Sequence, residues 1–278
     1  MDVLVTGAFG RVGTAILDHL GGSDDYAFTA FDLDPPESGP YADVDAVEGD
    51  AADYEALAAA TEGQDAVVHL AGVPAVDASW EAVLENNVVG MQNALQAARE
   101  AGVESFVFAS SNHAVGGYET DHAPALYEPG YGLVLDHESE RRPDSFYGTS
   151  KAFGEDLGRQ YVDLYDAPER FYALRIGSVR HPEYDHPYGD AERMVEEGEL
   201  ERGSEAYERW VKRMKATWHS RRDLAHLVDC CLRDDSVTHG VFSGVSANQR
   251  RWFDIEHARA TVGYDPQDDG ETFDAPPE

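Results

Sequence analysis

Residues 3–13, Val-Leu-Val-Thr-Gly-Ala-Phe-Gly-Arg-Val-Gly, decide the fold of this chain. The first four predict a short buried strand, and a helical stretch runs on to Leu20. Between them, Gly7, Gly10 and Gly13 stand at the spacing G-x-x-G-x-x-G. Glycines here permit a tight turn and let backbone N–H groups approach a pyrophosphate at the start of a helix. The stretch therefore predicts a dinucleotide-binding site.

A second strand is predicted at 26–31 and ends at Asp32. A carboxylate at this position can accept hydrogen bonds from the ribose of adenosine and repels a 2′-phosphate. Asp34 follows and no arginine stands beside it, which favours NAD over NADP. The alternative, a solvated acid on an acidic protein, stays open at this stage.

Strands and helices alternate along the first two thirds of the chain. We expect further strands at 44–47, 66–72, 105–109 and 171–176, with helices at 53–61, 80–101 and 144–165 and a loop-rich crossover at 116–143. Beyond these we expect an acidic, mostly helical segment at 185–208, helices at 205–218 and 222–233, a strand at 241–245 and a helix from Asp254. The alternation predicts the α/β class and a doubly wound parallel sheet, the Rossmann fold.

The predicted domains follow from this pattern. We expect an NAD-binding Rossmann domain at 1–176, a small, mostly helical substrate-binding region at 177–268 interleaved with the sheet, and a tail at 269–278. Ligands bind at the carboxyl ends of parallel strands. The residues predicted at that edge are Gly7, Asp32, Asp50, Ala71 and Ser111.

Tyr147 and Lys151 are four residues apart and share one face of a predicted helix. A nearby ammonium favours the phenolate form and lowers the pKa of the phenol. Such a pair can remove a proton from a substrate hydroxyl while an acceptor takes the hydride. An exposed helix face with no function would give the same spacing.

The chain carries 54 acidic and 21 basic residues, a net charge of −33, and only three lysines. With 42% apolar residues and clear strand patterns, we expect a folded surface adapted to molar salt rather than disorder. The charge makes nucleic acid or anionic membrane partners unfavourable. We expect no membrane span, no export signal and, from the adjacent cysteines Cys230 and Cys231, no disulfide, and therefore a cytoplasmic protein. The eleven histidines show no metal-ligand spacing, so no metal is expected.

Six of the 21 basic residues cluster between positions 209 and 222 with no acid among them. They are Arg209, Lys212, Arg213, Lys215, Arg221 and Arg222. One explanation is salt bridging to the acidic segment just before them. The other is an anion site, since arginine forks suit a carboxylate or a phosphate.

Taken together, these motifs resemble the extended short-chain dehydrogenase/reductase family. The matches are Gly7-x-x-Gly10-x-x-Gly13, Asp32, Gly49-Asp50, His69-Leu70-Ala71-Gly72, Asn87, Ser110-Ser111 and Tyr147-x-x-x-Lys151. The resemblance implies NAD as cofactor, Tyr147 as base, Lys151 as its pKa partner and ribose ligand, and Ser111 as donor to the reacting oxygen. The implied cofactor-binding residues are Gly7, Phe9, Gly10, Arg11, Val12, Gly13, Asp32, Leu33, Asp50, Ala51, Leu70, Ala71, Gly72, Asn87, Tyr147, Lys151 and Ile176.

Within the family, the segments 110–113, 175–178 and 213–220 resemble uronate dehydrogenases. The acidic segment, the basic cluster and the overall charge are more similar to the archaeal NAD-dependent glucose-6-phosphate dehydrogenases, and Pro74 departs from the uronate pattern. The resemblance implies NAD-dependent oxidation of the C1 hydroxyl of glucose 6-phosphate to 6-phosphogluconolactone. The implied substrate-binding residues are Ser111, Asn112, His113, Tyr147, Lys212, Arg213 and Arg221.

The alternatives are a uronate dehydrogenase and, after it, a sugar-nucleotide epimerase. A non-enzymatic dinucleotide sensor is disfavoured by the intact Tyr147 and Lys151. Family members commonly pair through the helices expected at 80–101 and 144–165, so a homodimer is the expected assembly.

Overall fold

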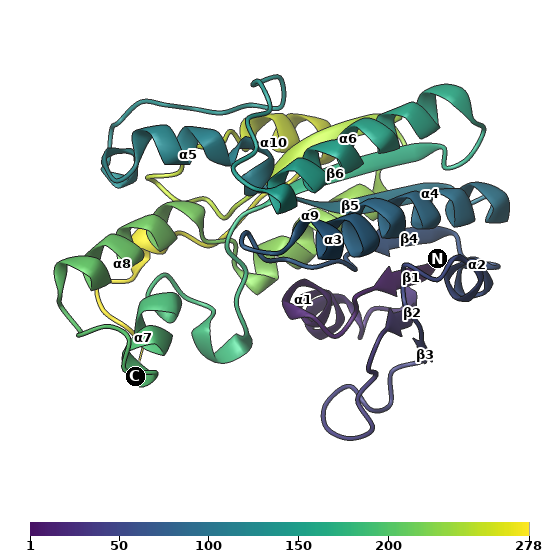
Figure 1. Ribbon diagram of the computed structural model, residues 1–278, viewed down its shortest axis with the longest axis horizontal. Coiled ribbons are helices and arrows are strands. Elements are labelled where there is room, and N and C mark those ends of the chain that lie inside the picture. Colours follow the sequence, from purple (N-terminus) through teal and green to yellow (C-terminus); the bar gives the residue numbers. More distant parts are fainter. Residues whose placement is uncertain (278) are drawn as a thin grey trace.

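The computed structural model describes residues 1–277 and contains one seven-stranded sheet flanked by helices (Figure 1). The strands are β1 (Asp2–Thr6), β2 (Ala27–Asp32), β3 (Ala46–Glu48), β4 (Ala66–His69), β5 (Ser105–Ser111), β6 (Arg170–Ile176) and β7 (His239–Gly244). Their order is β3-β2-β1-β4-β5-β6-β7, and every neighbouring pair is parallel. The predicted doubly wound parallel sheet is confirmed.

Helices cover both faces of the sheet. On one face lie α1 (Arg11–Leu20), α9 (Arg221–Arg233) and α10 (Glu256–Val262), and on the other lie α2 (Tyr54–Thr61), α4 (Gly90–Ala101) and α6 (Phe146–Leu164). Successive residues of β1 serve the two cores: Val3 and Val5 pack toward α1 and α9, while Leu4 packs toward α2 and α4. A strand that is buried on both sides has an apolar run in place of alternation, which is why residues 3–5 are all apolar.

The long helix expected at 80–101 is continuous but not uniform. It begins as α3 (Trp80–Val83), capped by Ser79, passes through a π-helical stretch η1 (Leu84–Val89) and continues as α4. The wide turn holds Asn86 and Asn87, and π-helical turns often occur at functional sites.

Two expectations about local structure are refined. The crossover at 116–143 is loop-rich, as expected, but it also contains a helix, α5 (Gly116–His122), which follows the 3-10 turn η2 (Asn112–Val115), and a second 3-10 turn, η3 (Ala125–Tyr127). The third strand is Ala46–Glu48 rather than 44–47, and all three of its residues are exposed at the sheet edge.

The region after β6 forms a second, smaller core. Its elements are η4 (Pro182–Tyr184), α7 (Gly189–Glu196) and α8 (Glu205–Thr217), and its core contains Tyr188, Ala191, Tyr207 and Val211. Figure 1 shows α7 and α8 together with α5 at the left of the view, beside the sheet. No helix within residues 1–277 has both the length and the apolar character needed to cross a bilayer.

The segment expected to be a tail is anchored as far as it is described. Residues 270–272 form the 3-10 turn η5 (Gly270–Thr272), and Lys215 Nζ donates a hydrogen bond of 2.7 Å to the Phe273 carbonyl. The Phe273 ring packs edge-on against Trp218 at 5.5 Å between ring centroids. Phe273 therefore packs against the small core and anchors this segment, and residue 278 lies outside the described residues.

Candidate active site

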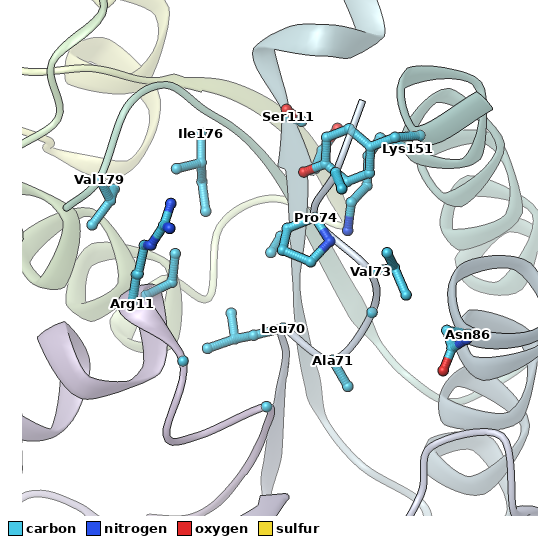
Figure 2. Close-up of a pocket in the computed structure, with 18 of the residues that line it drawn as sticks. Arg11, Leu70, Ala71, Val73, Pro74, Asn86, Ser111, Lys151, Ile176 and Val179 are labelled. Carbon is cyan, nitrogen blue, oxygen red and sulfur yellow. The ribbon is translucent and has the colours of Figure 1, made fainter. Parts of the chain in front are cut away.

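A cavity of about 830 Å³ opens at the carboxyl ends of the strands. The chain order changes direction between β1 and β4, and this is the point where open parallel sheets bind ligands. Its walls come from the glycine turn, the ends of β2, β4 and β5, the start of α6 and the segment that follows β6. Figure 2 shows Leu70 and Ala71 on the floor, with Ser111 and Lys151 on one side and Arg11 and Val179 on the other.

The glycine turn is shaped as a dinucleotide requires. Gly7 has a φ of +67°, and a Cβ there would lie 2.9 Å from the Ala71 nitrogen, so no other residue fits. A Cβ on Gly13 would lie 2.2 Å from the Ala8 carbonyl oxygen, so this glycine sets the close approach of α1 to the turn. The first turn of α1 thus points its free N–H groups at the cavity, where a pyrophosphate fits.

Asp32 ends β2 at the wall of the cavity. Its carboxylate accepts hydrogen bonds from the Phe9 N–H at 2.9 Å and the Leu33 N–H at 2.8 Å. Leu33, Asp50 and Ala51 line the same part of the cavity. The carboxylate is therefore fixed at the cavity wall, and its remaining lone pairs can accept further hydrogen bonds.

Tyr147 and Lys151 both line the cavity, on the first turns of α6. Ser145 caps that helix by accepting a hydrogen bond of 3.0 Å from the Gly148 N–H. Lys151 Nζ lies 5.5 Å from the Tyr147 ring centroid and 4.9 Å from that of Phe108.

The pKa values of this pair differ from the sequence-based expectation. Burial, with a contribution from Asp144, raises the pKa of Tyr147, and hydrogen bonding with Ser111 offsets this only in part. Burial also lowers the pKa of Lys151 to about 8. In the chain without cofactor, burial therefore dominates the pKa of Tyr147, and the lowering expected from Lys151 is not found.

Ser111 ends β5 and begins η2. Its Oγ accepts a hydrogen bond of 3.2 Å from the His113 N–H and lies 3.3 Å from Asn112 Oδ1. His113 Nδ1 is 2.7 Å from Asp144 Oδ2, and its ring stands edge-on to Tyr147 at 5.8 Å. Burial works to raise the pKa of Asp144, but the contacts with His113 and Ser145 outweigh it and leave that pKa below its usual value. The 111–113 segment is thus held beside the tyrosine by an ionised carboxylate.

His69 supports the floor of the cavity from inside the sheet. Burial, with Lys151 nearby, lowers the pKa of His69 to about 3, so its ring is neutral. Its Nδ1 lies 2.8 Å from Thr6 Oγ1, and the same oxygen accepts hydrogen bonds from the Leu70 and Ala71 N–H groups at 3.2 Å. These bonds fix the loop after β4.

Asn87, expected at the cofactor, has a structural role instead. Its side chain holds the loop after β4 by accepting from the Val73 N–H at 2.8 Å and donating to the Val73 carbonyl at 3.2 Å. It also donates to Ser150 Oγ at 3.1 Å, which ties that loop to α6. Its neighbour Asn86 lines the cavity.

Arg213 lines the cavity from α8 and is held by a carboxylate. Its guanidinium forms two bonds to Glu119 of α5, at 2.6 and 3.1 Å, and the Tyr127 hydroxyl donates to the same carboxylate at 2.7 Å. Burial works to lower the pKa of Arg213, but Glu119 outweighs it and raises that pKa. The arginine is thus a fixed cation at the cavity wall.

Four more residues of the basic cluster lie near protein carboxylates. Lys212 pairs with Glu128 at 2.6 Å, and Arg221 pairs with Asp18 at 2.6 Å. Lys215 is 3.8 Å from Glu271, and Arg222 is 2.7 Å from Asp268. None of these partners belongs to the acidic segment 185–208, so salt bridging was the right explanation for these four residues but with other partners. Lys212 and Arg221 do not line the cavity.

Most of the site residues predicted from the sequence line the cavity, and a few lie beside it. The cavity is lined by Gly7, Gly10, Arg11, Val12, Asp32, Leu33, Asp50, Ala51, Leu70, Ala71, Gly72, Ser111, Asn112, His113, Tyr147, Lys151, Ile176 and Arg213. Phe9 and Gly13 lie beside it and support the turn. The lining residues that were missed are Phe31, Gly49, Val73, Pro74, Ala75, Asn86, Ala109, Ser110, Gly177, Ser178, Val179, Arg180 and His181. The last five follow β6. The rule that ligands bind at the carboxyl ends of parallel strands, which predicted Ser111, would therefore have predicted them as well.

The comparisons with known proteins agree with this geometry. The profile of the NAD dependent epimerase/dehydratase family matches residues 3–231. NAD-dependent glucose-6-phosphate dehydrogenase from Haloferax volcanii is 42% identical over 276 residues, which cover 98% of this chain and 95% of that protein. Uronate dehydrogenase from Pseudomonas putida is 33% identical over 275 residues, covering 98% and 86%. A mutant uronate dehydrogenase from Agrobacterium tumefaciens, solved in complex with NAD, has a TM-score of 0.74 at 30% identity and covers 100% of this chain and 91% of that chain.

These similarities extend over nearly the whole chain and include the elements that build the cavity. Together with the glycine turn and the fixed Asp32, they make NAD the cofactor and relate the chain to sugar dehydrogenases. The chain is an enzyme of the NAD dependent epimerase/dehydratase family.

Proposed function

We propose that this enzyme oxidises the C1 hydroxyl of glucose 6-phosphate to 6-phosphogluconolactone, with NAD as the hydride acceptor. One observation carries the proposal: a single cavity joins Asp32, the Tyr147–Lys151 pair with Ser111, and Arg213. These residues supply a ribose acceptor, a proton acceptor with a hydroxyl donor, and a fixed cation.

In the proposed reaction, Tyr147 removes the C1 hydroxyl proton while NAD takes the C1 hydride. The Ser111 hydroxyl donates a hydrogen bond to the same oxygen, and Asn112 and His113 bind other sugar hydroxyls. The glycine turn holds the pyrophosphate and Asp32 the adenosine ribose. Other proposed cofactor contacts come from Leu33, Asp50, Ala51, Leu70, Gly72 and Ile176.

Lys151 completes this arrangement. Its buried ammonium faces the cavity, and among residues 1–277 no carboxylate pairs with it. Ribose hydroxyls beside Nζ would stabilise the ammonium form and raise the Lys151 pKa above about 8. A firmly charged lysine then favours the phenolate of Tyr147, so we propose that the phenol is activated only when cofactor is bound.

Two considerations bear on which sugar is used. Glucose 6-phosphate and a hexuronate both carry their negative charge on C6 and their reacting hydroxyl on C1, so Arg213 suits either. The 42% identity to a glucose-6-phosphate dehydrogenase supports the phosphate. The pairing of four residues of the basic cluster with acids removes one argument for a phosphate and favours the uronate as the second candidate.

The test is NADH formation at 340 nm in about 2 M KCl, with glucose 6-phosphate and glucuronate as separate substrates. The proposal requires that kcat/KM be higher for the phosphate, roughly tenfold or more. A higher value for glucuronate would move the assignment to uronate. If the enzyme binds NAD but forms no NADH with either sugar, a sugar-nucleotide epimerase would be favoured.

We also propose that the enzyme works in the cytoplasm of a salt-accumulating cell, which the net charge of −33 supports. Maximal activity is then expected above 1 M KCl. A fall in activity from low salt upward would contradict this.

A homodimer is proposed through the face made by α3, η1 and α6. The apolar side chains of Trp80, Leu84, Phe146 and Phe153 are exposed there, and Trp80 packs edge-on against Phe146 at 5.6 Å. Exposed apolar side chains grouped in this way indicate an association surface. Light scattering in 2 M KCl should give twice the chain mass, and Phe146→Glu should halve it.

A further inference from the structure

Three arginines line the cavity. Arg11 comes from the start of α1, Arg180 from the loop after β6 and Arg213 from α8. Asp190 of α7 binds Arg180 through two bonds, and its charge also acts on the other two arginines. The acidic segment 185–208 thus contributes a carboxylate to the electrostatics of this part of the site.

Two of the three arginines are already neutralised. Arg180 is paired with Asp190 and Arg213 with Glu119. Among residues 1–277, no carboxylate forms a salt bridge with Arg11. One positive charge is therefore in excess at this end of the cavity, and it belongs to Arg11.

The main chain of Arg11 is anchored, whereas its side chain is exposed at the cavity. Its carbonyl accepts a hydrogen bond of 3.1 Å from Arg221 Nη1, and Arg221 is itself anchored by Asp18. Burial and the nearby Arg180 lower the pKa of Arg11, which means that its surroundings disfavour an uncompensated charge. Figure 2 shows the guanidinium extending toward Ile176 and Val179, residues at and beyond the end of β6.

We propose that Arg11 binds the C6 phosphate of the sugar together with Arg213, and that it sets the preference for a phosphate over a carboxylate. This rests on the proposed function. A carboxylate has one charge and two oxygens, which Arg213 can satisfy alone. A phosphate has three oxygens and nearly two charges, and binds best between two forks. The side chain of Arg11 then serves the substrate, while its backbone N–H remains available to the cofactor.

The first test measures KM. Arg11→Gln should raise the KM for glucose 6-phosphate roughly 10- to 100-fold, as expected for the loss of a charge-assisted hydrogen bond. The kcat, the KM for glucuronate and the Kd for NAD should change less than threefold. Arg11→Lys keeps the charge but loses the planar pair of donors, so its KM for glucose 6-phosphate should lie between those of wild type and Arg11→Gln. Arg193→Gln is the matched control. The charge of Arg193 acts on Arg11, but Arg193 does not line the cavity and pairs with Glu197.

A Kd for NAD that rises as much as the KM for glucose 6-phosphate would overturn the proposal and assign Arg11 to the pyrophosphate. An equal loss with both sugars would overturn it as well, since it would show a general effect on the pocket.

The second test does not depend on turnover. 1,5-Anhydroglucitol 6-phosphate has no C1 hydroxyl to oxidise, and its binding to the NADH-saturated enzyme can be followed by calorimetry. We expect wild type to bind it at least tenfold more tightly than unphosphorylated 1,5-anhydroglucitol, and Arg11→Gln to lose that advantage. The affinity should also rise from pH 5 to pH 7 in wild type, as the second phosphate proton leaves near pH 6, and should be nearly flat in the variant. An equal phosphate advantage in both proteins would overturn the proposal.

The two failures are distinguishable. If wild type oxidises neither sugar but binds the phosphate probe through Arg11, the proposed reaction is wrong and the phosphate site stands. If wild type oxidises glucose 6-phosphate while Arg11→Gln binds the probe as tightly as wild type, the reaction stands and the role of Arg11 is wrong.

Discussion

Replacing Lys151 by methionine should stabilise the cofactor-free chain while removing its activity. Lys151 is 6% exposed, and burial lowers its pKa from 10.5 to about 8. This fall corresponds to about 3 kcal/mol of unfavourable free energy for keeping the ammonium form in the folded chain below pH 8. Methionine has a similar shape and no charge, so we expect a gain in stability of about 1–3 kcal/mol at pH 7.

The sign of the pH dependence follows from the same pKa. The unfolded chain keeps the lysine proton up to about pH 10.5, whereas the folded chain releases it near pH 8. Between these values the unfolded state binds more protons, so wild-type stability rises with pH. The advantage of Lys151→Met should therefore be largest below pH 8 and shrink toward pH 10.

The assay is thermal unfolding without cofactor in 2 M KCl at pH 7, 8, 9 and 10. The variant should melt about 2–12 °C above wild type at pH 7, given about 2–4 °C per kcal/mol for a chain of this size. Sugar oxidation should fall at least about 100-fold, because the tyrosine loses its charged neighbour.

Lys215→Met is the matched control for this experiment. Lys215 is almost as buried, but its ammonium donates to the Phe273 carbonyl at 2.7 Å and lies 3.8 Å from Glu271. Its removal leaves those groups without a partner, so this variant should melt below wild type. A Lys151→Met protein that melts lower than wild type, or whose gain does not depend on pH, would refute the reasoning about the buried ammonium.

Further predictions concern the cofactor, the base and the anion site. Tyr147→Phe should lower kcat roughly 100-fold or more and leave the Kd for NAD within threefold, measured by NADH formation and by fluorescence titration. Asp32→Asn removes the charge that repels a 2′-phosphate, so the ratio of kcat/KM for NAD to that for NADP should fall at least about tenfold, and an unchanged ratio would show that specificity lies elsewhere. Glu119→Gln weakens the fork on Arg213, so the KM for the sugar should rise roughly tenfold with little change in kcat; a change in kcat alone would contradict this. Gly13→Ala would bring a Cβ within 2.2 Å of the Ala8 carbonyl oxygen, so it should lower the melting temperature and abolish NAD binding together.

The sheet and the cofactor half of the cavity could be predicted because local patterns specify them. A buried strand, a glycine turn and an amphipathic helix each leave a signal within about twenty residues. The edge rule then places Asp32 and Ser111 at one site without any knowledge of packing. The errors in this half concern Asn87, which does not line the cavity, and an exposed edge strand, β3, where burial imposes no pattern.

The substrate half could not be predicted in the same way, because its salt bridges join distant parts of the sequence. Arg221 pairs with Asp18, 203 residues away, and Lys212 pairs with Glu128, 84 residues away. A basic cluster has the same appearance in the sequence whether its partners are protein carboxylates or a bound anion. The sequence also could not show which of Asn86 and Asn87 lines the cavity, since both lie in the π-helical stretch η1.

The pKa of Tyr147 shows the same limit in energetic terms. The spacing of Tyr147 and Lys151 was enough to place both on one helix face, but not to give the depth at which they are buried. Burial raises the pKa of the phenol and lowers that of the ammonium, so burial favours the neutral form of both groups in the absence of a ligand.

The most direct test of the central claim is transfer of isotope from C1. Glucose 6-phosphate labelled with deuterium at C1 would be incubated with NAD and the enzyme in 2 M KCl, and the NADH would be analysed by mass spectrometry. The account predicts one deuterium in each NADH formed by wild type and no labelled NADH from Tyr147→Phe above roughly 1% of the wild-type amount. NADH without deuterium, formed by wild type at a normal rate, would place the oxidation at another carbon and contradict the account.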